Sequence, residues 1–317
     1  MTDVTGRGQI DLPSHDTERD MPITTRLLIA DDWQDYALLD SGDGLKLERF
    51  GTQTVIRPDP QAYWTPQSQP TSWRADARFE TGGEDNDRGR WERINPSAPD
   101  VWPMAWQSLT FEVRRTPFRH LGLFQEHSVH WTFAADQIGR AGRPVRVLNL
   151  FGYTGMMSLA CAAAGAEVVH LDASPKSNGY GKANQALSGL EDRPIRWITD
   201  DAMKFVAREN RRGNRYDAII LDPPKFGRGP KNETWRFEND FTGLLDAARN
   251  LLTPDPLFVI LTAYAVRLSY LSIGQALADR MSPFGGQMEI GEMALPQKGA
   301  ARLLPTAIYA RWMANKD

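Results

Sequence analysis

A short motif, Asp222-Pro223-Pro224-Lys225-Phe226, follows an apolar segment at 216–221 that is typical of a buried strand. Its two prolines lack backbone N–H donors and stiffen the turn after the strand. The proline carbonyls and the Asp222 carboxylate can therefore offer acceptors to an amino group, and Phe226 can stack on a flat ring. The predicted catalytic residues are Asp222, Pro223, Pro224 and Phe226, and Asp222 is also predicted to contact a cofactor.

A second motif joins a predicted strand at 145–150 to a predicted helix at 154–164. The turn contains Gly152 and Gly155, which let the backbone approach a ligand closely. Backbone N–H groups at the helix start favour a negative group such as a carboxylate. The dinucleotide pattern GxGxxG is absent because Phe151 and Tyr153 interrupt it. The predicted cofactor contacts in this motif are Asn149, Phe151, Gly152, Tyr153, Thr154 and Gly155.

Two more acids follow the next two predicted strands, which span 167–171 and 195–199. Asp172 can accept both hydroxyls of a ribose, and Asp201 can accept from an adenine amino group. Either acid could instead cap the helix that follows it. With the turn at 152–155, these strand ends offer contacts for an amino acid, a ribose and an adenine, which together make up S-adenosylmethionine. The predicted contacts here are Asp172, Ala173, Ser174, Asp201 and Ala202.

Strands and helices alternate from about residue 144 onward, which favours a parallel sheet with helices on both faces. The predicted helices are 154–164, 174–187, 202–210, 241–252 and 268–280. The predicted strands are 145–150, 167–171, 195–199, 216–221, 257–262, 287–293 and 306–312, of which the last two could form an antiparallel pair. We therefore expect an α/β fold for this part of the chain.

The N-terminal part has a different pattern. Short apolar pieces separated by Gly and Pro favour a small β-rich module, with its many tryptophans in the core. The first residues are polar and acidic and lack an apolar period, as in a mobile tail. The predicted parts are a mobile polar tail at 1–24, a β-rich module at 25–121 and the α/β domain at 122–317.

The motifs resemble those of class I S-adenosylmethionine-dependent methyltransferases, and most closely those of bacterial large-subunit ribosomal RNA methyltransferases. The resemblance is carried by 147–155, Asp172, Asp200-Asp201, 222–226 and the upstream run Gly122-Leu123-Phe124-Gln125-Glu126. It implies a Rossmann-like seven-stranded sheet of order 3-2-1-4-5-7-6. It also implies that 149–154 bracket the methionine part of the cofactor, Asp172 the ribose and Asp201 the adenine, while Phe124 and Gln125 close over the cofactor.

The single cysteine, Cys161, bears on the reaction. Relatives that make 5-methylcytosine attack the base with a thiolate, because C5 is a poor nucleophile. In those relatives the cysteine follows strand five, where this chain has Leu261-Thr262-Ala263-Tyr264-Ala265. Cys161 lies in a small apolar helix and is expected to pack there. Methyl transfer to a nitrogen needs mainly positioning of the acceptor, so the sequence favours a nitrogen acceptor.

Basic residues gather beside the proposed site. Residues 204–231 contain eight Lys or Arg against three acids, which could bind phosphates or simply form a solvated face. The loop at 227–232 is expected to be mobile. The predicted substrate-binding residues are Lys225, Arg228, Lys231 and Tyr264.

The whole chain has 37 Lys or Arg and 40 Asp or Glu, a formal net charge of −3. This net charge excludes a surface that is basic all over, as in some nucleic-acid-binding proteins. The total combines an acidic N-terminal stretch and the basic stretch at 204–231. Neither a signal peptide nor a membrane-spanning run is expected, so a cytoplasmic protein is predicted. No metal is predicted, and the oligomeric state is left open.

The main hypothesis is methyl transfer from S-adenosyl-L-methionine to a base nitrogen in structured RNA, ribosomal RNA in particular. The alternatives are a protein or small-molecule acceptor, or a cofactor-binding module without catalysis.

Overall fold

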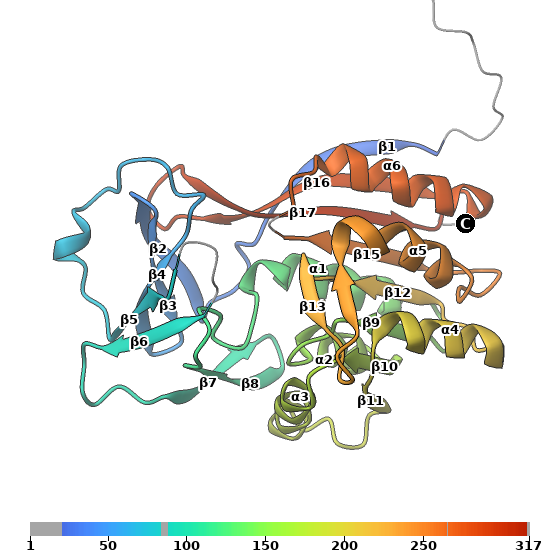
Figure 1. Cartoon of the computed structure of the whole chain (residues 1–317), viewed down its shortest axis with the longest axis horizontal. Helices are drawn as coiled ribbons and strands as arrows, with labels where there is room; N and C mark the ends of the chain where they lie inside the picture. Colours follow the sequence, from blue (N-terminus) through green and yellow to red (C-terminus); the bar gives the residue numbers. More distant parts are fainter. Residues whose placement is uncertain (1–20, 84–87, 265, 316–317) are drawn as a thin grey trace, which may run out of the picture.

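The computed structural model describes residues 21–83, 88–264 and 266–315. They form an α/β domain with a β-rich module beside it (Figure 1). The predicted polar tail at 1–24 lies outside the described residues except for its last four. Within the described ranges, every helix is too short or too polar to traverse a lipid bilayer.

The α/β domain is built on one eight-stranded sheet. Its strands are β1 (Ile23–Ile29), β9 (Arg146–Leu150), β10 (Glu167–Asp172), β11 (Ile195–Thr199), β12 (Ala218–Leu221), β15 (Phe258–Ala263), β16 (Gln287–Pro296) and β17 (Leu303–Met313). The spatial order is β1-β16-β17-β15-β12-β9-β10-β11. Counted from β9, seven of these strands have the order 3-2-1-4-5-7-6 that the resemblance implies. The strand β17 is antiparallel to both neighbours, and the predicted antiparallel end pair is confirmed.

The eighth strand, β1, differs from the sequence prediction. It lies at the sheet edge and pairs in parallel with β16 from Ile23↔Met288 to Ile29↔Ala294. Residues 25–29, expected to begin the β-rich module, therefore belong to the main sheet. The strand is mostly exposed, and its mixed polar character is suited to covering the edge that β16 would otherwise present to solvent.

Six α-helices cover the sheet. They are α1 (Ser128–Arg140), α2 (Met156–Ala163), α3 (Pro175–Leu187), α4 (Ala202–Arg212), α5 (Phe237–Arg249) and α6 (Tyr270–Met281). One apolar core contains residues of α1 and α2, and the other contains residues of α4, α5 and α6. The strands feed both cores, since Val147 of β9 is in the first and Leu148 is in the second. Figure 1 shows the resulting three layers.

The β-rich module has a five-stranded sheet and a separate hairpin. The sheet contains β2 (Tyr36–Gly42), β3 (Leu45–Phe50), β4 (Gln53–Pro58), β5 (Ala77–Thr81) and β6 (Gly89–Arg93), and the hairpin contains β7 (Val101–Trp106) and β8 (Leu109–Arg114). The module also has a short 3-10 helix, η1 (Pro70–Ser72), and the α/β domain has two, η2 (Gln125–His127) and η3 (Ser282–Phe284). The tryptophans expected in the core include Trp33, Trp102 and Trp106, which are buried.

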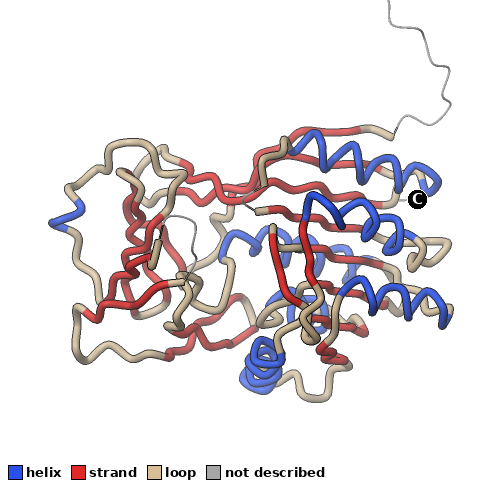
Figure 2. Tube along the Cα trace, viewed as in Figure 1, coloured by secondary structure: helices blue, strands red, loops and turns tan. Residues whose placement is uncertain are grey.

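The module is fixed to the domain in two ways. Its apolar core continues into α1, where the Trp33 and Trp131 rings lie 5.6 Å apart. The hairpin of β16 and β17 also reaches across to the module, as Figure 2 shows. At its tip, the Lys298 N–H donates to the Leu38 carbonyl at 2.8 Å, and the Arg302 guanidinium donates to the Thr65 carbonyl at 2.8 Å. The module and the domain are therefore held together both by apolar packing and by hydrogen bonds.

Candidate active site

The turn after β9 has an unusual backbone conformation. Phe151 and Tyr153 have φ values of 60° and 51°, in the left-handed region that residues other than glycine rarely adopt. A Cβ on Gly152 would lie 2.3 Å from Cε1 of His170, so close packing on His170 requires a glycine. The Tyr153 N–H donates to Asp172 Oδ2 at 2.9 Å. Such strain is common at ligand sites, where the surrounding structure holds it in place.

The helix α2 begins with an N-terminus that no side chain caps. Its N-cap residue, Gly155, has a φ of 90°, and a Cβ there would lie 2.6 Å from the Trp197 ring. The first-turn N–H groups of α2 therefore lack a side-chain acceptor, and a helix N-terminus attracts negative charge. The predicted use of this turn for a carboxylate fits the donor set that the structure presents.

A pocket lies in front of this turn. It contains eight of the predicted cofactor residues, namely Phe124, Asn149, Phe151, Gly152, Tyr153, Thr154, Gly155 and Asp222. Its other lining residues were missed by sequence reasoning, namely Leu123, His127, Trp131, Met156, Met157 and Ile220. The apolar walls and few polar groups are typical of a small-molecule site. We call this the cofactor pocket.

The predicted ribose and adenine contacts lie at the neighbouring strand ends and do not line the cofactor pocket. Each oxygen of Asp172 accepts one backbone N–H, from Tyr153 at 2.9 Å and from Ser174 at 2.8 Å. A carboxylate oxygen can accept more than one bond, so Asp172 keeps acceptor capacity for a ribose. Ser174 and Asp201 both act as N-caps, of α3 and α4, and Ala173 and Ala202 adjoin them. Asp201 therefore caps the helix that follows it, as the alternative interpretation predicted, because its Oδ1 accepts the Lys204 N–H at 3.0 Å.

Gln125 requires a correction, because it does not line the cofactor pocket. Its buried side chain points to the β-rich module, where its amide donates to Glu48 Oε1 at 3.3 Å. The neighbouring Phe124 does lie in the pocket. The 3-10 turn of η2 sends consecutive side chains in different directions, which a linear motif does not reveal.

The Asp222 motif directly follows β12. Asp222 Oδ1 is buried and has no hydrogen-bond partner among the described residues. Burial raises the pKa of Asp222 to about 6; His127 opposes this rise and Glu126 adds to it. The Pro224 carbonyl accepts the Trp235 indole N–H at 2.6 Å, so this carbonyl is already used within the protein. Of the two proline carbonyls, that of Pro223 is left to receive a ligand N–H.

Phe226 lies elsewhere than predicted. It begins a small hairpin of β13 (Phe226–Arg228) and β14 (Thr234–Arg236), whose turn contains most of the loop that was expected to be mobile. Its side chain is 51% exposed and lines neither the cofactor pocket nor the larger cavity described below. The guanidinium groups of Arg228 and Arg236 each lie 5.7 Å from its ring centroid. Phe226 is therefore a surface aromatic residue between two cations.

A chain of polar contacts surrounds Asp222. The Tyr264 hydroxyl donates to Glu126 Oε1 at 2.9 Å and is 2.6 Å from His127 Nε2. The same His127 nitrogen lies 3.6 Å from Asp222 Oδ2. Burial lowers the pKa of His127, so its imidazole is neutral at pH 7. The sequence predicted Tyr264 but missed His127 and Glu126, although both directly follow Phe124-Gln125.

The basic stretch at 204–231 is partly neutralised. Lys204 pairs with Glu233 at 2.6 Å, Arg208 with Asp200 at 2.7 Å, and Arg212 with Glu209 at 3.4 Å. The predicted substrate-binding residues Lys225, Arg228 and Lys231 are exposed at and beside the hairpin of β13 and β14. Arg211, Arg212 and Arg215, on and after α4, are exposed too, so the exposed cations of the stretch lie on both elements.

Cys161 is fully buried in α2, and burial raises the pKa of its thiol to about 12. It lies outside the cofactor pocket. A thiolate requires ionisation and access to the substrate, and this residue has neither. The expectation that Cys161 only packs against its neighbours agrees with this placement. The described residues also contain no group of three or more His, Cys, Asp or Glu side chains that could hold a metal ion.

Known proteins share this architecture. An S-adenosylmethionine-dependent methyltransferase family model matches residues 87–272. A solved structure of an S-adenosylmethionine-dependent methyltransferase from Agrobacterium tumefaciens is 42% identical, with a TM-score of 0.88; the match covers 94% of this chain and 97% of that one.

Curated relatives match a shorter region. A protein named ribosomal RNA large subunit methyltransferase K/L from Shewanella baltica is 32% identical over 146 residues, or 45% of this chain. The protein of the same name from Pseudoalteromonas atlantica is also 32% identical over 146 residues. The match covers 20% of each of these relatives, which are much longer. The family model and the full-length match to the Agrobacterium structure show that the chain belongs to the S-adenosylmethionine-dependent methyltransferase family.

Proposed function

We propose that this methyltransferase acts on a base nitrogen in ribosomal RNA. The observation that carries the proposal is the buried Oδ1 of Asp222 at the wall of the cofactor pocket, which has no partner among the residues that the structure describes. An acceptor oxygen in this position suits an N–H group that must be held and then lose its proton. The names of the K/L relatives supply the polymer, since they describe large-subunit ribosomal RNA methyltransferases. This substrate implies a cytoplasmic location, which is part of the proposal.

The donors and acceptors at and beside the cofactor pocket suit the polar groups of S-adenosylmethionine. The uncapped N-terminus of α2 would receive the carboxylate, and Asp172 has acceptor capacity for the ribose. We assign the predicted contacts Ala173, Ser174, Asp201 and Ala202 to the same ligand as part of the proposal. When bound, the cofactor supplies an electrophilic methyl group on a sulfonium.

The residues around Asp222 would prepare the acceptor. Because the pKa of Asp222 is about 6, the carboxylate is mostly ionised at pH 7 and can accept a hydrogen bond from an acceptor N–H. The Pro223 carbonyl would hold a second N–H in the same plane. Transfer forms an N–C bond and breaks the S–C bond, and the acceptor proton passes to Asp222 and then to water. No thiolate takes part, in agreement with the buried position of Cys161.

The exposed Phe226 and its basic neighbours are proposed to contact the RNA, and not the base nitrogen that is methylated. Phe226, Arg228 and Lys225 are available to the RNA outside the pocket, where an aromatic ring can stack on a base and cations can bind phosphates. Phe226 is thus proposed to hold a flanking nucleotide. Tyr264 contributes from inside, through its bonds to Glu126 and His127.

The test is tritiated methyl transfer from S-adenosylmethionine into fractionated cell RNA and protein. The proposal predicts label in ribosomal RNA, and loss of at least about 99% of it in Asp222→Asn. Calorimetry should show that both proteins still bind S-adenosylhomocysteine, so that the loss of label reports the transfer step. Label in protein alone would favour the second acceptor class, and cofactor binding without label in any fraction would favour a non-catalytic module.

A further inference from the structure

A second, larger space lies between the β-rich module and the α/β domain. This cavity of about 330 Å³ adjoins the cofactor pocket, and Phe124 lines both. Its walls come from β3 and β4 of the module, the segment at 119–126, the residues after β15, and β17. Its volume is within the range of about 300–1,000 Å³ that small-molecule sites have. We call it the interface cavity.

We infer that the interface cavity receives the nucleobase that is methylated, and that the β-rich module forms part of the substrate site. This inference rests on the proposed function for the reaction, but it assigns a recognition site to the module. Base-modifying enzymes take the target base out of its stack into a pocket of this kind. The location fits, because a base in the cavity would reach the cofactor pocket beside Phe124.

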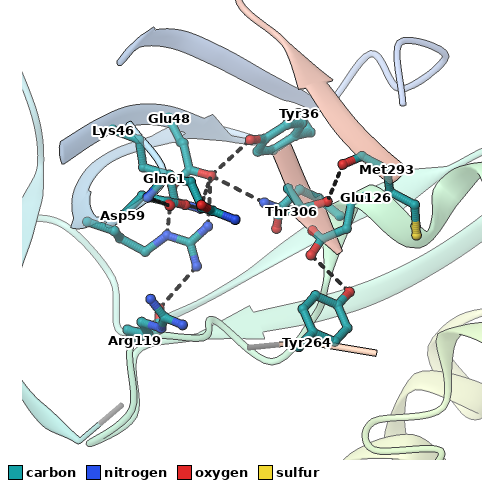
Figure 3. A network of polar contacts seen from close by, with 12 residues as sticks. Tyr36, Lys46, Glu48, Asp59, Gln61, Arg119, Glu126, Tyr264, Met293 and Thr306 are labelled. Carbon is teal, nitrogen blue, oxygen red and sulfur yellow. Dashed lines mark hydrogen bonds and ion pairs between the residues drawn. The ribbon is translucent and has the colours of Figure 1, made fainter. Parts of the chain in front are cut away.

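The charges in the cavity favour an uncharged occupant. Lys46 Nζ is 3.0 Å from Asp59 Oδ2, so this cation is already paired. Arg57 donates through Nε and Nη2 to Glu48 at 2.7 and 2.8 Å, and through Nη1 to the Arg119 carbonyl at 3.1 Å. These groups are therefore engaged within the protein, and Figure 3 shows Lys46, Glu48 and Asp59 of this network. A phosphate would have to break buried ion pairs, which is costly.

Unused hydrogen-bonding groups face the cavity from both sides. In the described part of the chain, Glu126 uses Oε1 for the Tyr264 hydroxyl, and no partner is present for Oε2. The side-chain amide of Gln61, on the module, likewise makes no hydrogen bond within the described residues. One side thus offers a carboxylate acceptor and the other an amide with a donor and an acceptor. Together they match the mixed donor and acceptor edge of a base.

Flat surfaces complete the site. The Phe124 and Tyr264 rings line the cavity with centroids 5.3 Å apart, and Pro58, Pro60 and Pro305 line it too. Rings of this kind stack on any base, so selectivity would come from Glu126 and Gln61. The occupant that combines a flat face, no charge and a mixed polar edge is a nucleobase.

The experiment separates the base site from the reaction. The protein saturated with S-adenosylhomocysteine is titrated with each of the four ribonucleosides, and with ribose 5-phosphate, by saturation-transfer NMR. We expect transfer to the base protons of at least one nucleoside. Gln61→Trp, which fills the cavity from an exposed position, should reduce that transfer at least tenfold. Tyr63→Trp is the matched control, since Tyr63 is 90% exposed in the same loop and lies outside the cavity.

Methyl transfer to RNA is measured on the same variants. Gln61→Trp should lose at least tenfold in kcat/KM, whereas Tyr63→Trp and the affinity of both variants for S-adenosylhomocysteine should stay within twofold of the original protein. The inference is overturned if no nucleoside gives transfer, if ribose 5-phosphate gives the stronger signal, or if the two variants behave alike. Label in protein but not RNA would defeat the proposed function alone, because the NMR titration still decides the base site.

Discussion

Asp222 and His127 are neighbours in the wall of the cofactor pocket, with Asp222 Oδ2 3.6 Å from His127 Nε2, while Asp222 Oδ1 is left without a partner among the described residues. One oxygen is thus oriented by the protein and the other is available to a ligand. His127 is held in turn by Tyr264, at 2.6 Å. The contact with His127 therefore orients the Asp222 carboxylate, so that Oδ1 is the oxygen available to a ligand.

Activity should depend on the ionisation of Asp222. Its pKa is raised to about 6 by burial, and the acceptor function requires the ionised form. We expect kcat/KM to rise with pH through about 6 and to level off above 7. Asp222→Asn should lack this inflection in its residual activity. An unchanged pH profile in the variant would show that another group titrates.

The same burial should make Asp222 destabilising. Because its pKa is higher in the folded protein, the folded state binds more protons than the unfolded state between about pH 4 and 6, and stability falls as pH rises through this range. Asp222→Asn should therefore raise the free energy of unfolding at pH 7.5 by about 2 kcal/mol. The gain should vanish near pH 4.

Urea unfolding at the two pH values measures this effect. Asp279→Asn on the exposed side of α6 is the matched control and should change stability little at either pH. A loss of stability in Asp222→Asn at pH 7.5 would mean that the contact with His127 outweighs the cost of burial.

The turn at Gly152 should tolerate no added methyl group. A Cβ there would lie 2.3 Å from Cε1 of His170, and neither the turn nor the buried ring has room to move. We expect Gly152→Ala to cost about 1–3 kcal/mol of stability and to weaken S-adenosylhomocysteine binding. In Gly179→Ala nothing lies within 4 Å of the new Cβ, so this helix position should be neutral or slightly stabilised. Equal stabilities by thermal unfolding would contradict the packing argument.

The hairpin of β13 and β14 should contribute to RNA affinity. Reversing both charges, in Arg228→Glu with Lys231→Glu, should weaken RNA binding about tenfold at low salt and leave cofactor binding unchanged. The matched control reverses Lys182 and Arg193, two exposed cations near α3. Filter binding at two salt concentrations checks this. The same loss in both double variants would indicate a general charge effect, and no loss in either would remove the hairpin from the RNA site.

Much of the α/β domain could be predicted because its pattern is local. The strands β10 and β11 begin where predicted, since Gly165 lies just before the first and Pro194 just before the second. The helix α5 begins at Phe237, not 241, because Phe237 packs into the core one turn earlier. The helix α1, whose N-cap residue is His127, was not predicted.

The parts that were not predicted depend on contacts distant in sequence. The role of β1 follows from its pairing with β16, more than 250 residues away. Gln125 points to Glu48 because the module lies over η2, which no local pattern shows. The interface cavity has the same origin, since Gln61 and Glu126 line one space only because the module and the domain pack together.

The central claim is methyl transfer to a base nitrogen of ribosomal RNA without a cysteine nucleophile. The most direct measurement is mass spectrometry of nucleosides from ribosomal RNA treated with the protein and S-adenosylmethionine carrying a deuterated methyl group. The account predicts the deuterated methyl group on a ring or exocyclic nitrogen of one nucleoside, and its loss with Asp222→Asn but not with Cys161→Ala. A label on C5 of cytosine that disappears with Cys161→Ala would contradict it.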